Sequence, residues 1–412
     1  MTAPIVEHFF RHEYGRLVAM LVRRVGAQRI EAIEDSVQHA LIAALEHWPI
    51  HGPPACASAW LYRVAVNHLV DEFRKSANRQ RILERNSRTA LNGSIAEVEP
   101  TFSGEVQDDL LRMLFVCCDP HIPTESQLVL ALKTLCGFDV REIALRLFTS
   151  EANIYKRLGR ARDRLRAHPP DWDRLDGVDV KSRLPAVHTI LYVLFTEGHL
   201  SVHVEAAMRR ELCQEAIRLA LILAGHSVGQ CPETYALLAL MHLHDARADA
   251  RQDHSGVLLL LEDQDRTRWN RRGIETGLGW LARSATGTRL TRYHAEAGIA
   301  AEHCLAVSFE STRWDRIVEY YELLDKLAPS ALYRLNRAIA LAELEGPQAA
   351  LTSLEGIEPP RWLSTSYLWP AVLADLHARA EQPELAAPYR ETAIDSAPTP
   401  AIRAALRRRL AG

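Results

Sequence analysis

No stretch of the sequence is apolar enough, over the roughly 20 residues that a bilayer requires, to cross a membrane. The longest apolar stretches, at 214–224 and 255–261, are too short or too interrupted by polar residues. The first residues, Met1 to Arg11, mix charged and apolar side chains and show no basic cap, apolar core and cleavage site. We therefore expect a protein without a membrane span that stays in the cytoplasm.

Cysteine is scarce and unevenly placed, with seven residues scattered through 412. An odd, scattered set is unlike a paired disulfide framework and predicts reduced thiols. Cys117, Cys118 and His121 are the one grouping that suggests a metal site. Adjacent cysteines cannot easily provide the two-residue gap of a zinc knuckle, and no second Cys/His pair follows at a suitable spacing. We expect buried helix cysteines there, and no metal or other cofactor.

Charge of one sign does not dominate, because 49 Lys and Arg stand against 52 Asp and Glu. The basic residues are nevertheless concentrated in two places. Arg74 to Arg88 holds six basic residues and one acid, and Lys156 to Arg166 holds six basic residues and one acid. Phosphate groups respond to such local fields rather than to net charge. For a single run, a solvated helix face is the alternative interpretation.

Long alternating patterns typical of β-strands are missing, and apolar residues recur at helical spacing. The sequence therefore predicts an all-α fold. Prolines, glycines and shifts in charge divide it into four parts. They are a small helical bundle at 5–88, a flexible linker at 89–107, a second helical module at 108–168, and a long C-terminal helical domain at 171–412.

One internal repeat is visible in the C-terminal part at an offset of 36 residues. It aligns Leu332 with Leu368, Ala342 with Ala378, Pro347 with Pro383, and Ala350 with Ala386. Small residues at helix crossings and a proline at a turn suit a two-helix repeat, near the period of about 34 residues of tetratricopeptide repeats. We expect tetratricopeptide-like repeats near 330–395.

Residues 139–165 have the pattern of a helix-turn-helix: a short amphipathic helix, a tight turn and a second, basic helix. Burial of Ile154, Leu158, Ala161 and Leu165 would leave the polar side chains of the second helix outside. Asn and Arg can contact base edges, whereas Lys and the later Arg residues suit phosphates. The predicted DNA-binding residues are Asn153, Tyr155, Lys156, Arg157, Arg160 and Arg164. An ordinary helical hairpin with a charged face is the alternative.

Two motifs in this order resemble a known family. Glu142-Ile143-Ala144 followed by 156–165 is similar to region 4 of bacterial sigma-70 factors of the extracytoplasmic-function class. The segments 33–40 and 59–67 resemble region 2 of the same factors. The resemblance covers about residues 5–168. The long tail resembles that of a subgroup with a C-terminal tetratricopeptide-like domain.

The resemblance implies a sigma factor that binds core RNA polymerase and directs recognition and melting of promoter DNA at its −35 and −10 elements. It implies that Asp35 and Gln38 contact polymerase. A protein that opens a duplex can capture an unstacked base near aromatic and amide side chains. The residues expected at the −10 element and in melting are Trp60, Arg63, Asn67, Arg74 and Lys75. A core aromatic is the alternative for Trp60.

The tail contains an acidic and aromatic segment, 258–270, with Glu262, Asp263 and Trp269. Because no nucleophile, ligand set or Gly-rich phosphate loop accompanies it, we expect an ion-pair network around a buried Trp and no enzyme activity. The tail is expected to modulate activity, with a regulatory protein as a possible partner. A stand-alone helix-turn-helix regulator is the alternative function, and an enzyme fused to a DNA-binding module is a third.

Overall fold

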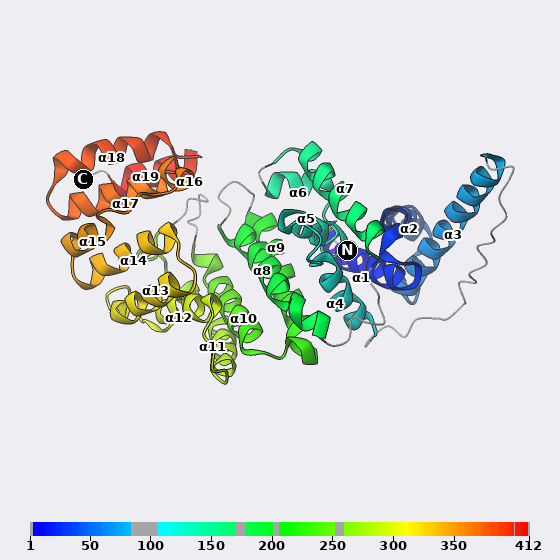
Figure 1. The fold of residues 1–412 in the computed structure, drawn as a ribbon, viewed down its shortest axis with the longest axis horizontal. Helices are drawn as coiled ribbons and strands as arrows, with labels where there is room; N and C mark the ends of the chain where they lie inside the picture. Colours follow the sequence, from blue (N-terminus) through cyan, green and yellow to red (C-terminus); the bar gives the residue numbers. More distant parts are fainter. Residues whose placement is uncertain are drawn as a thin grey trace. The chain divides into compact units, whose positions relative to one another are not determined.

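The computed structural model describes residues 3–83, 105–147, 149–169, 178–200, 206–251, 259–398 and 400–410. Throughout these residues every regular element is a helix and no strand occurs (Figure 1), which confirms the all-α prediction. The chain forms two compact units, Met1–Val193 and Leu194–Gly412. Their boundary lies within one helix, α8 (Val178–Leu200). Most of the expected linker, 89–104, and the basic residues Arg85 and Arg88 lie outside the described residues.

The N-terminal unit consists of seven helices and the first part of α8. They are α1 (Ala3–Val25), α2 (Ile30–His51), α3 (Ala57–Leu83), α4 (Glu105–Cys117), α5 (Thr124–Thr134), α6 (Val140–Arg146) and α7 (Glu151–Ala167). The last four belong to the part of the chain predicted as a second helical module at 108–168, although α4 begins three residues before Asp108.

Local sequence signals fix the two short helices α6 and α7. Asp139 begins α6 with a capping box, in which its carboxylate accepts from the Glu142 amide at 2.6 Å and Glu142 accepts from the Asp139 amide at 2.8 Å. Ser150 caps α7 by accepting from the Asn153 amide at 3.3 Å. Such caps satisfy amides that have no partner within the helix. These two caps define the residues at which α6 and α7 begin.

Helix α1 is the central element of this unit, because it packs against α2 on one side and against α4 and α5 on another. Its residues Leu17, Val18, Leu21 and Val22 are almost fully buried. At Gly15 the backbone of α1 passes so close to the Leu135 carbonyl oxygen that a Cβ there would overlap it. The two predicted N-terminal modules therefore pack on a shared helix instead of standing apart.

The C-terminal unit continues from α8 as a succession of helices (Figure 1). They are α9 (Ala206–Gly225), α10 (Pro232–Asp245), α11 (Arg271–Ser284), α12 (Arg292–Leu305), α13 (Trp314–Leu327), α14 (Ala331–Leu344), α15 (Pro347–Leu354), α16 (Arg361–Ser364), α17 (Leu368–Arg379), α18 (Pro383–Asp395) and α19 (Pro400–Arg409). Consecutive helices pair closely, above all α10 with α11 and α17 with α18.

The repeat seen in the sequence corresponds to two such pairs, α14–α15 and α17–α18. Pro347 and Pro383 each stand in the first turn of the second helix of a pair, where the missing amide hydrogen costs nothing. Ala350 and Ala386 are buried at equivalent places, 0% and 8% exposed. The core of this part includes Ala295, Ile317, Leu335, Ala338 and Leu376, contributed by successive helices.

Candidate nucleic-acid interface

Helix α7 distributes its basic residues over two faces. Ile154, Leu158, Ala161 and Leu165 are buried, at most 2% exposed, as predicted. At 3.6 residues per turn, Lys156, Arg160 and Arg164 fall on one outward stripe, and all three are exposed. Arg162 and Arg166 fall on another face. The outward stripe is the part of α7 that is free to meet a phosphate backbone.

The other predicted DNA-binding residues of α7 differ in their exposure and in the contacts that their side chains make. Tyr155 is 60% exposed. The Asn153 side chain donates to the Thr149 hydroxyl at 2.7 Å, and it is half-buried. Arg157 pairs with Glu125 of α5 at 3.0 Å, with its side chain 20% exposed. Asn153 and Arg157 are thus held by the hairpin itself and are less available than Lys156, Arg160 and Arg164.

Arg162 and Arg166 point to α2 instead of outward. Arg162 donates through Nη2 to Glu34 Oε2 at 2.6 Å and through Nη1 to Glu31 Oε1 at 2.7 Å. Arg166 donates to Glu31 Oε2 at 2.8 Å. The basic run therefore serves two purposes that its composition cannot separate. Lys156, Arg160 and Arg164 are exposed, whereas Arg162 and Arg166 attach α7 to α2.

The Glu34 end of this contact lies in the interior of the unit. Glu34 is 2% exposed and neighbours Tyr14 of α1 and Lys133 of α5, which are also buried. Burial raises the pKa of the Glu34 carboxyl, while the charges of Arg162 and Lys133 lower it. Burial also raises the pKa of Tyr14. Sequence reasoning missed Glu31 and Glu34, because only the fold brings them to residues 128 or more positions away.

Helix α3 brings together the residues predicted for the −10 element. Trp60, Arg63, Asn67 and Arg74 are spaced by 3, 4 and 7 residues, so they follow one stripe about 21 Å long. Arg63, Asn67, Arg74 and Lys75 are exposed. Arg74 and Lys75 pair with Asp71 at 3.6 Å and Glu72 at 3.1 Å. Such exposed pairs contribute only about 0–1 kcal/mol, so a phosphate can replace them.

Trp60 is half-buried at the start of this stripe, in a group of aromatic rings. Its ring centroid lies 5.7 Å from that of Trp48, edge-on, and 5.7 Å from that of His47. The ring is therefore neither part of the main core nor fully free. The loop at 52–56 directly precedes α3, the helix that carries Trp60 near its start.

Helix α2 presents a second outward stripe that joins polar and apolar residues. Asp35 and Gln38, the predicted polymerase contacts, are exposed. Ile42 and Leu45 continue the stripe by one and two turns and are 55% and 53% exposed. Large apolar side chains in a row on a surface helix are typical of a docking surface. The spacing of Ile42 and Leu45 from Gln38 could have indicated them.

The thiols bear out the prediction of buried helix cysteines at Cys117 and Cys118, each 0% exposed. Burial raises the pKa of Cys117 to about 12, although the Thr134 hydroxyl 3.4 Å away lowers it. All seven cysteines are free. His121 bonds to the Asp119 carboxylate at 2.8 Å. In the part of the chain that the structure describes, no cluster of three or more metal-ligating side chains occurs, and no helix has the length and apolar content of a membrane span.

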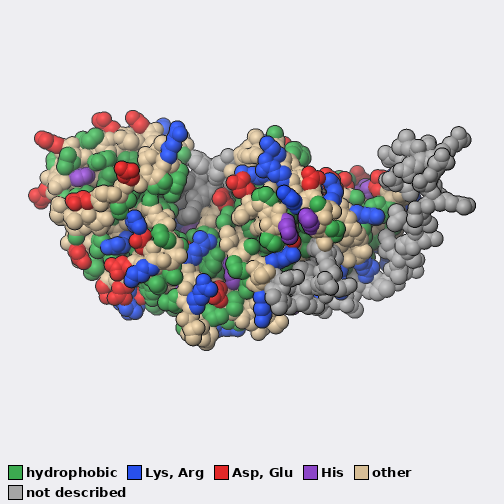
Figure 2. All heavy atoms as spheres, viewed as in Figure 1, with side chains coloured by type: hydrophobic (Ala, Val, Ile, Leu, Met, Phe, Trp, Pro, Cys, Tyr) green, Lys and Arg blue, Asp and Glu red, His purple; other side chains and the backbone are tan. Residues whose placement is uncertain are grey.

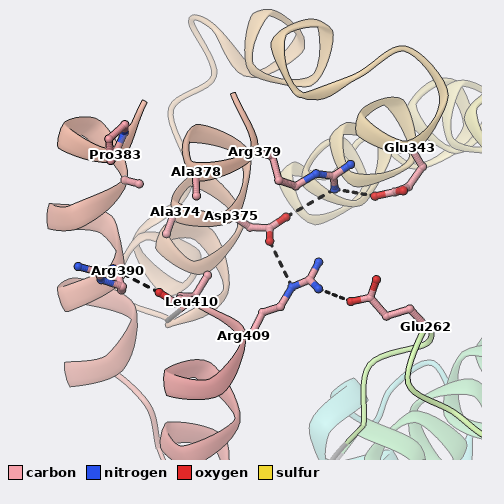
Figure 3. A pocket seen from close by; sticks show the side chains of 11 residues that line it. Glu262, Glu343, Ala374, Asp375, Ala378, Arg379, Pro383, Arg390, Arg409 and Leu410 are labelled. Carbon is pink, nitrogen blue, oxygen red and sulfur yellow. Dashed lines mark hydrogen bonds and ion pairs between the residues drawn. The ribbon is translucent and has the colours of Figure 1, made fainter. Parts of the chain in front are cut away.

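A pocket of about 580 Å³ lies beside α17, α18 and α19 in the C-terminal unit (Figure 3). A chain of ion pairs crosses it from Glu343 through Arg379, Asp375 and Arg409 to Glu262. The carboxylates in the pocket thus face guanidinium groups. Trp269 is buried at 5% exposure as predicted. The ion pairs of Glu262 do not surround it as expected, because the charged groups over its ring are the cations Arg247 and Arg266.

The visible surface mixes both signs of charge. Basic and acidic side chains are interspersed over the described residues on the face drawn in Figure 2, without a broad field of one sign. An interface with nucleic acid on this chain therefore depends on narrow stripes such as those of α3 and α7, because local charge sets the attraction for phosphate.

Comparison with known proteins gives two family matches. Residues 10–79, which include α2 and most of α3, match sigma-70 region 2. Residues 183–285 match a family of unknown function, DUF6596. No solved structure is significantly similar to the chain.

Two curated proteins are similar to the chain. The uncharacterized protein R00370 of Rhizobium meliloti is 36% identical over 329 residues, which cover 80% of this chain and 78% of that protein. The RNA polymerase sigma factor CnrH of Cupriavidus metallidurans is 28% identical over 156 residues, which cover 37% of this chain and 81% of that protein.

Proposed function

Because this chain belongs to the same protein family as R00370 of Rhizobium meliloti and carries a sigma-70 region 2, we propose that it is an RNA polymerase sigma factor of the extracytoplasmic-function class. The region 2 match and the similarity to CnrH support a sigma-70 family factor. The observation that carries the proposal is the placement of the predicted region 2 residues on two exposed stripes, one on α2 and one on α3.

The α2 stripe is the proposed polymerase contact. Asp35 and Gln38 supply polar groups, and Ile42 and Leu45 supply solvent-exposed apolar surface that a partner can bury. Burial of apolar surface stabilises a complex by about 25 cal/mol per Å². An interface of this kind combines apolar area at its centre with charged residues that orient the partner.

The α3 stripe is the proposed contact with the melted −10 strand. Arg63, Arg74 and Lys75 can hold phosphates, and Asn67 can bond to a base edge. Trp60, which is half-buried, offers an aromatic ring against which an unstacked base can stack, and such stacking contributes about 1–3 kcal/mol per base. Helices α6 and α7 are the proposed helix-turn-helix for the −35 element, with Lys156, Arg160 and Arg164 toward the duplex.

The C-terminal unit is proposed to be tetratricopeptide-like and to modulate the factor, either directly or by binding a regulatory protein. The chain itself performs no covalent chemistry, and it acts in the cytoplasm with polymerase. The chain promotes opening of the duplex through binding alone, because its contacts to the separated strand offset the base stacking that is lost.

The test is association of the purified full chain with bacterial core RNA polymerase. Ile42→Glu and Leu45→Glu should each weaken binding at least about tenfold, because a buried unpaired carboxylate replaces apolar contact. Leu385→Glu, at a leucine of α18 that is equally exposed (53%) and far from α2 in the sequence, introduces the same charge as the matched control and should bind normally. Equal binding by all variants, or no binding by the wild type with duplex binding retained, would favour a regulator that acts without polymerase.

A further inference from the structure

In the C-terminal unit, two guanidinium groups surround one buried indole. Trp269 follows the short 3₁₀ turn Arg266–Arg268 and is 5% exposed. The Arg266 Cζ lies 4.6 Å from the centroid of its ring, and the Arg247 Cζ, from the end of α10, lies 5.2 Å from it. The positive charges of Arg247 and Arg266 also lower the pKa of His303 of α12. The end of α10 and the turn at 266–268 thus meet at Trp269, and α12 contacts Arg266.

The same groups carry hydrogen-bond donors without acceptors. Arg266 is anchored through Nη1, which donates to the backbone oxygens of His303 at 2.9 Å and Ala306 at 2.6 Å. Its Nη2 has no partner. Three further nitrogens, Nε of Arg247, Nε1 of Trp269 and Nδ1 of His303, are shielded from solvent and also have no partner. Buried polar groups are nearly always satisfied, so four orphaned nitrogens around one ring require an explanation.

The positive charges around the ring lack a paired carboxylate, just as the donors lack acceptors. Among the described residues, neither Arg247 nor Arg266 forms an ion pair with a carboxylate. Nearby acids are used elsewhere: Asp249 pairs with Arg210, and Asp265 bonds to Thr267. Glu310 influences Arg266 through its field from an exposed position. Burial lowers the pKa of Arg247, and the Arg266 charge lowers it further.

Two neighbouring guanidinium groups without a counter-charge are unfavourable where burial removes water from them, because each loses hydration and the two repel each other. Here the donors include two planar guanidinium groups, the side chain that best matches the paired oxygens of carboxylate and phosphate. The indole and imidazole add neutral N–H groups. Burial, with the charges of Arg247 and Arg266, lowers the pKa of His303 to about 3, so its ring adds no third charge.

We propose that Arg247, Arg266 and Trp269 form an oxyanion-binding site in the C-terminal unit. The ligand is a small molecule with a phosphate or carboxylate group. Its oxygens accept from Arg247 Nε, Arg266 Nη2 and the Trp269 indole, and its charge offsets that of the two guanidinium groups. The site lies apart from the α2, α3 and α7 stripes and gives this unit a ligand of its own.

The test is thermal unfolding of the full chain with sodium phosphate, against sodium chloride at equal ionic strength. Phosphate should raise the unfolding temperature saturably, as a ligand specific for the native state does. Arg247→Met and Arg266→Met should each weaken the apparent affinity at least about tenfold, since a charge-assisted bond is lost. Arg272→Met, at an exposed position on α11, is the control and should respond as the wild type does.

Trp269→Phe keeps the buried ring and removes only the indole N–H, so it tests the site even if an arginine variant fails to fold. It should weaken phosphate binding several-fold. Parallel titrations with adenosine monophosphate and citrate distinguish a phosphate ester from a carboxylate as the preferred source of the oxyanion. An unfolding temperature that responds only to ionic strength for every anion, or a saturable response that survives both arginine substitutions, would overturn the proposal.

Discussion

Arg162 of α7 donates to Glu34 of α2 at 2.6 Å, and this bond joins the two modules of the N-terminal unit. The Glu34 side chain is 3% exposed and the Arg162 side chain 15% exposed, so the pair is largely shielded from water. A buried pair contributes little against an apolar replacement of both partners, but the loss of one partner leaves an uncompensated charge. The pair therefore makes the packing of α7 on α2 sensitive to single substitutions.

Arg162→Met should lower the free energy of unfolding by about 3 kcal/mol, because Glu34 stays buried without its main counter-charge. Arg166→Met, whose side chain is 51% exposed, should cost less than about 1 kcal/mol. The double variant Glu34→Gln with Arg162→Met should recover part of the loss. Urea denaturation of the full chain measures all three. Equal effects of Arg162→Met and Arg166→Met would show that the Glu34 contact is not buried in solution.

Gly15→Ala should destabilise the N-terminal unit by about 1–3 kcal/mol, because the added methyl overlaps the Leu135 carbonyl and forces α1 away from α5. Gly159→Ala in α7 is the matched control, since a Cβ there meets nothing within 4 Å. It should be neutral or stabilise the helix by up to about 1 kcal/mol. Thermal and urea unfolding compare the two. Tolerance of alanine at residue 15 would contradict the close packing of α1 on α5.

Lys156→Gln and Arg160→Gln should weaken binding to duplex DNA and flatten its dependence on salt. Each lost phosphate contact should reduce the slope of log K against log salt concentration by about 0.9. Arg166→Gln, on the same helix but bonded to Glu31, should leave that slope unchanged. Fluorescence anisotropy with a labelled duplex at several salt concentrations gives the slopes. A larger change of slope with Arg166→Gln than with Lys156→Gln would contradict the prediction, because it would place the DNA contact on the face of α7 that carries Arg166.

The free energy of unfolding should fall as the pH falls from 7.5 to 5, in part because of His303. Its pKa in the folded chain is about 3, against 6.5 ordinarily, so over this range only the unfolded chain binds the proton. This group alone should remove about 2 kcal/mol of stability between pH 7.5 and 5. His303→Gln should show a loss smaller by that amount in denaturation without phosphate. An identical pH dependence of both proteins would contradict the burial of His303.

The helices could be predicted from the sequence because their signals are local. The caps Asp139 and Ser150 and the 3.6-residue spacing of Ile154, Leu158 and Leu165 each lie within one or two turns, so residue order alone reveals them. The stripe of Trp60, Arg63, Asn67 and Arg74 was likewise accessible from spacing. For the same reason the repeat placed Pro347 and Pro383 at a turn, and in the structure each stands in the first turn of a helix.

The contacts between distant segments could not be predicted. Arg162 belongs to a basic run whose composition suggests DNA, and only the packing of α1 against α5 brings it to Glu34. The convergence of Arg247 and Arg266 on Trp269, with His303 bonded to Arg266, depends on how α10, the turn at 266–268 and α12 meet. Neither arrangement leaves a trace in local periodicity, because the partners are separated by many turns of chain.

The most direct test of the account is run-off transcription by bacterial core RNA polymerase from a library of genomic fragments, with and without the purified full chain. The account predicts new transcripts that share a −35 and a −10 sequence, that need the chain, and that fall strongly with Leu45→Glu but not with Leu385→Glu. Absence of chain-dependent transcripts, while the chain still binds duplex DNA, would contradict its assignment as a sigma factor.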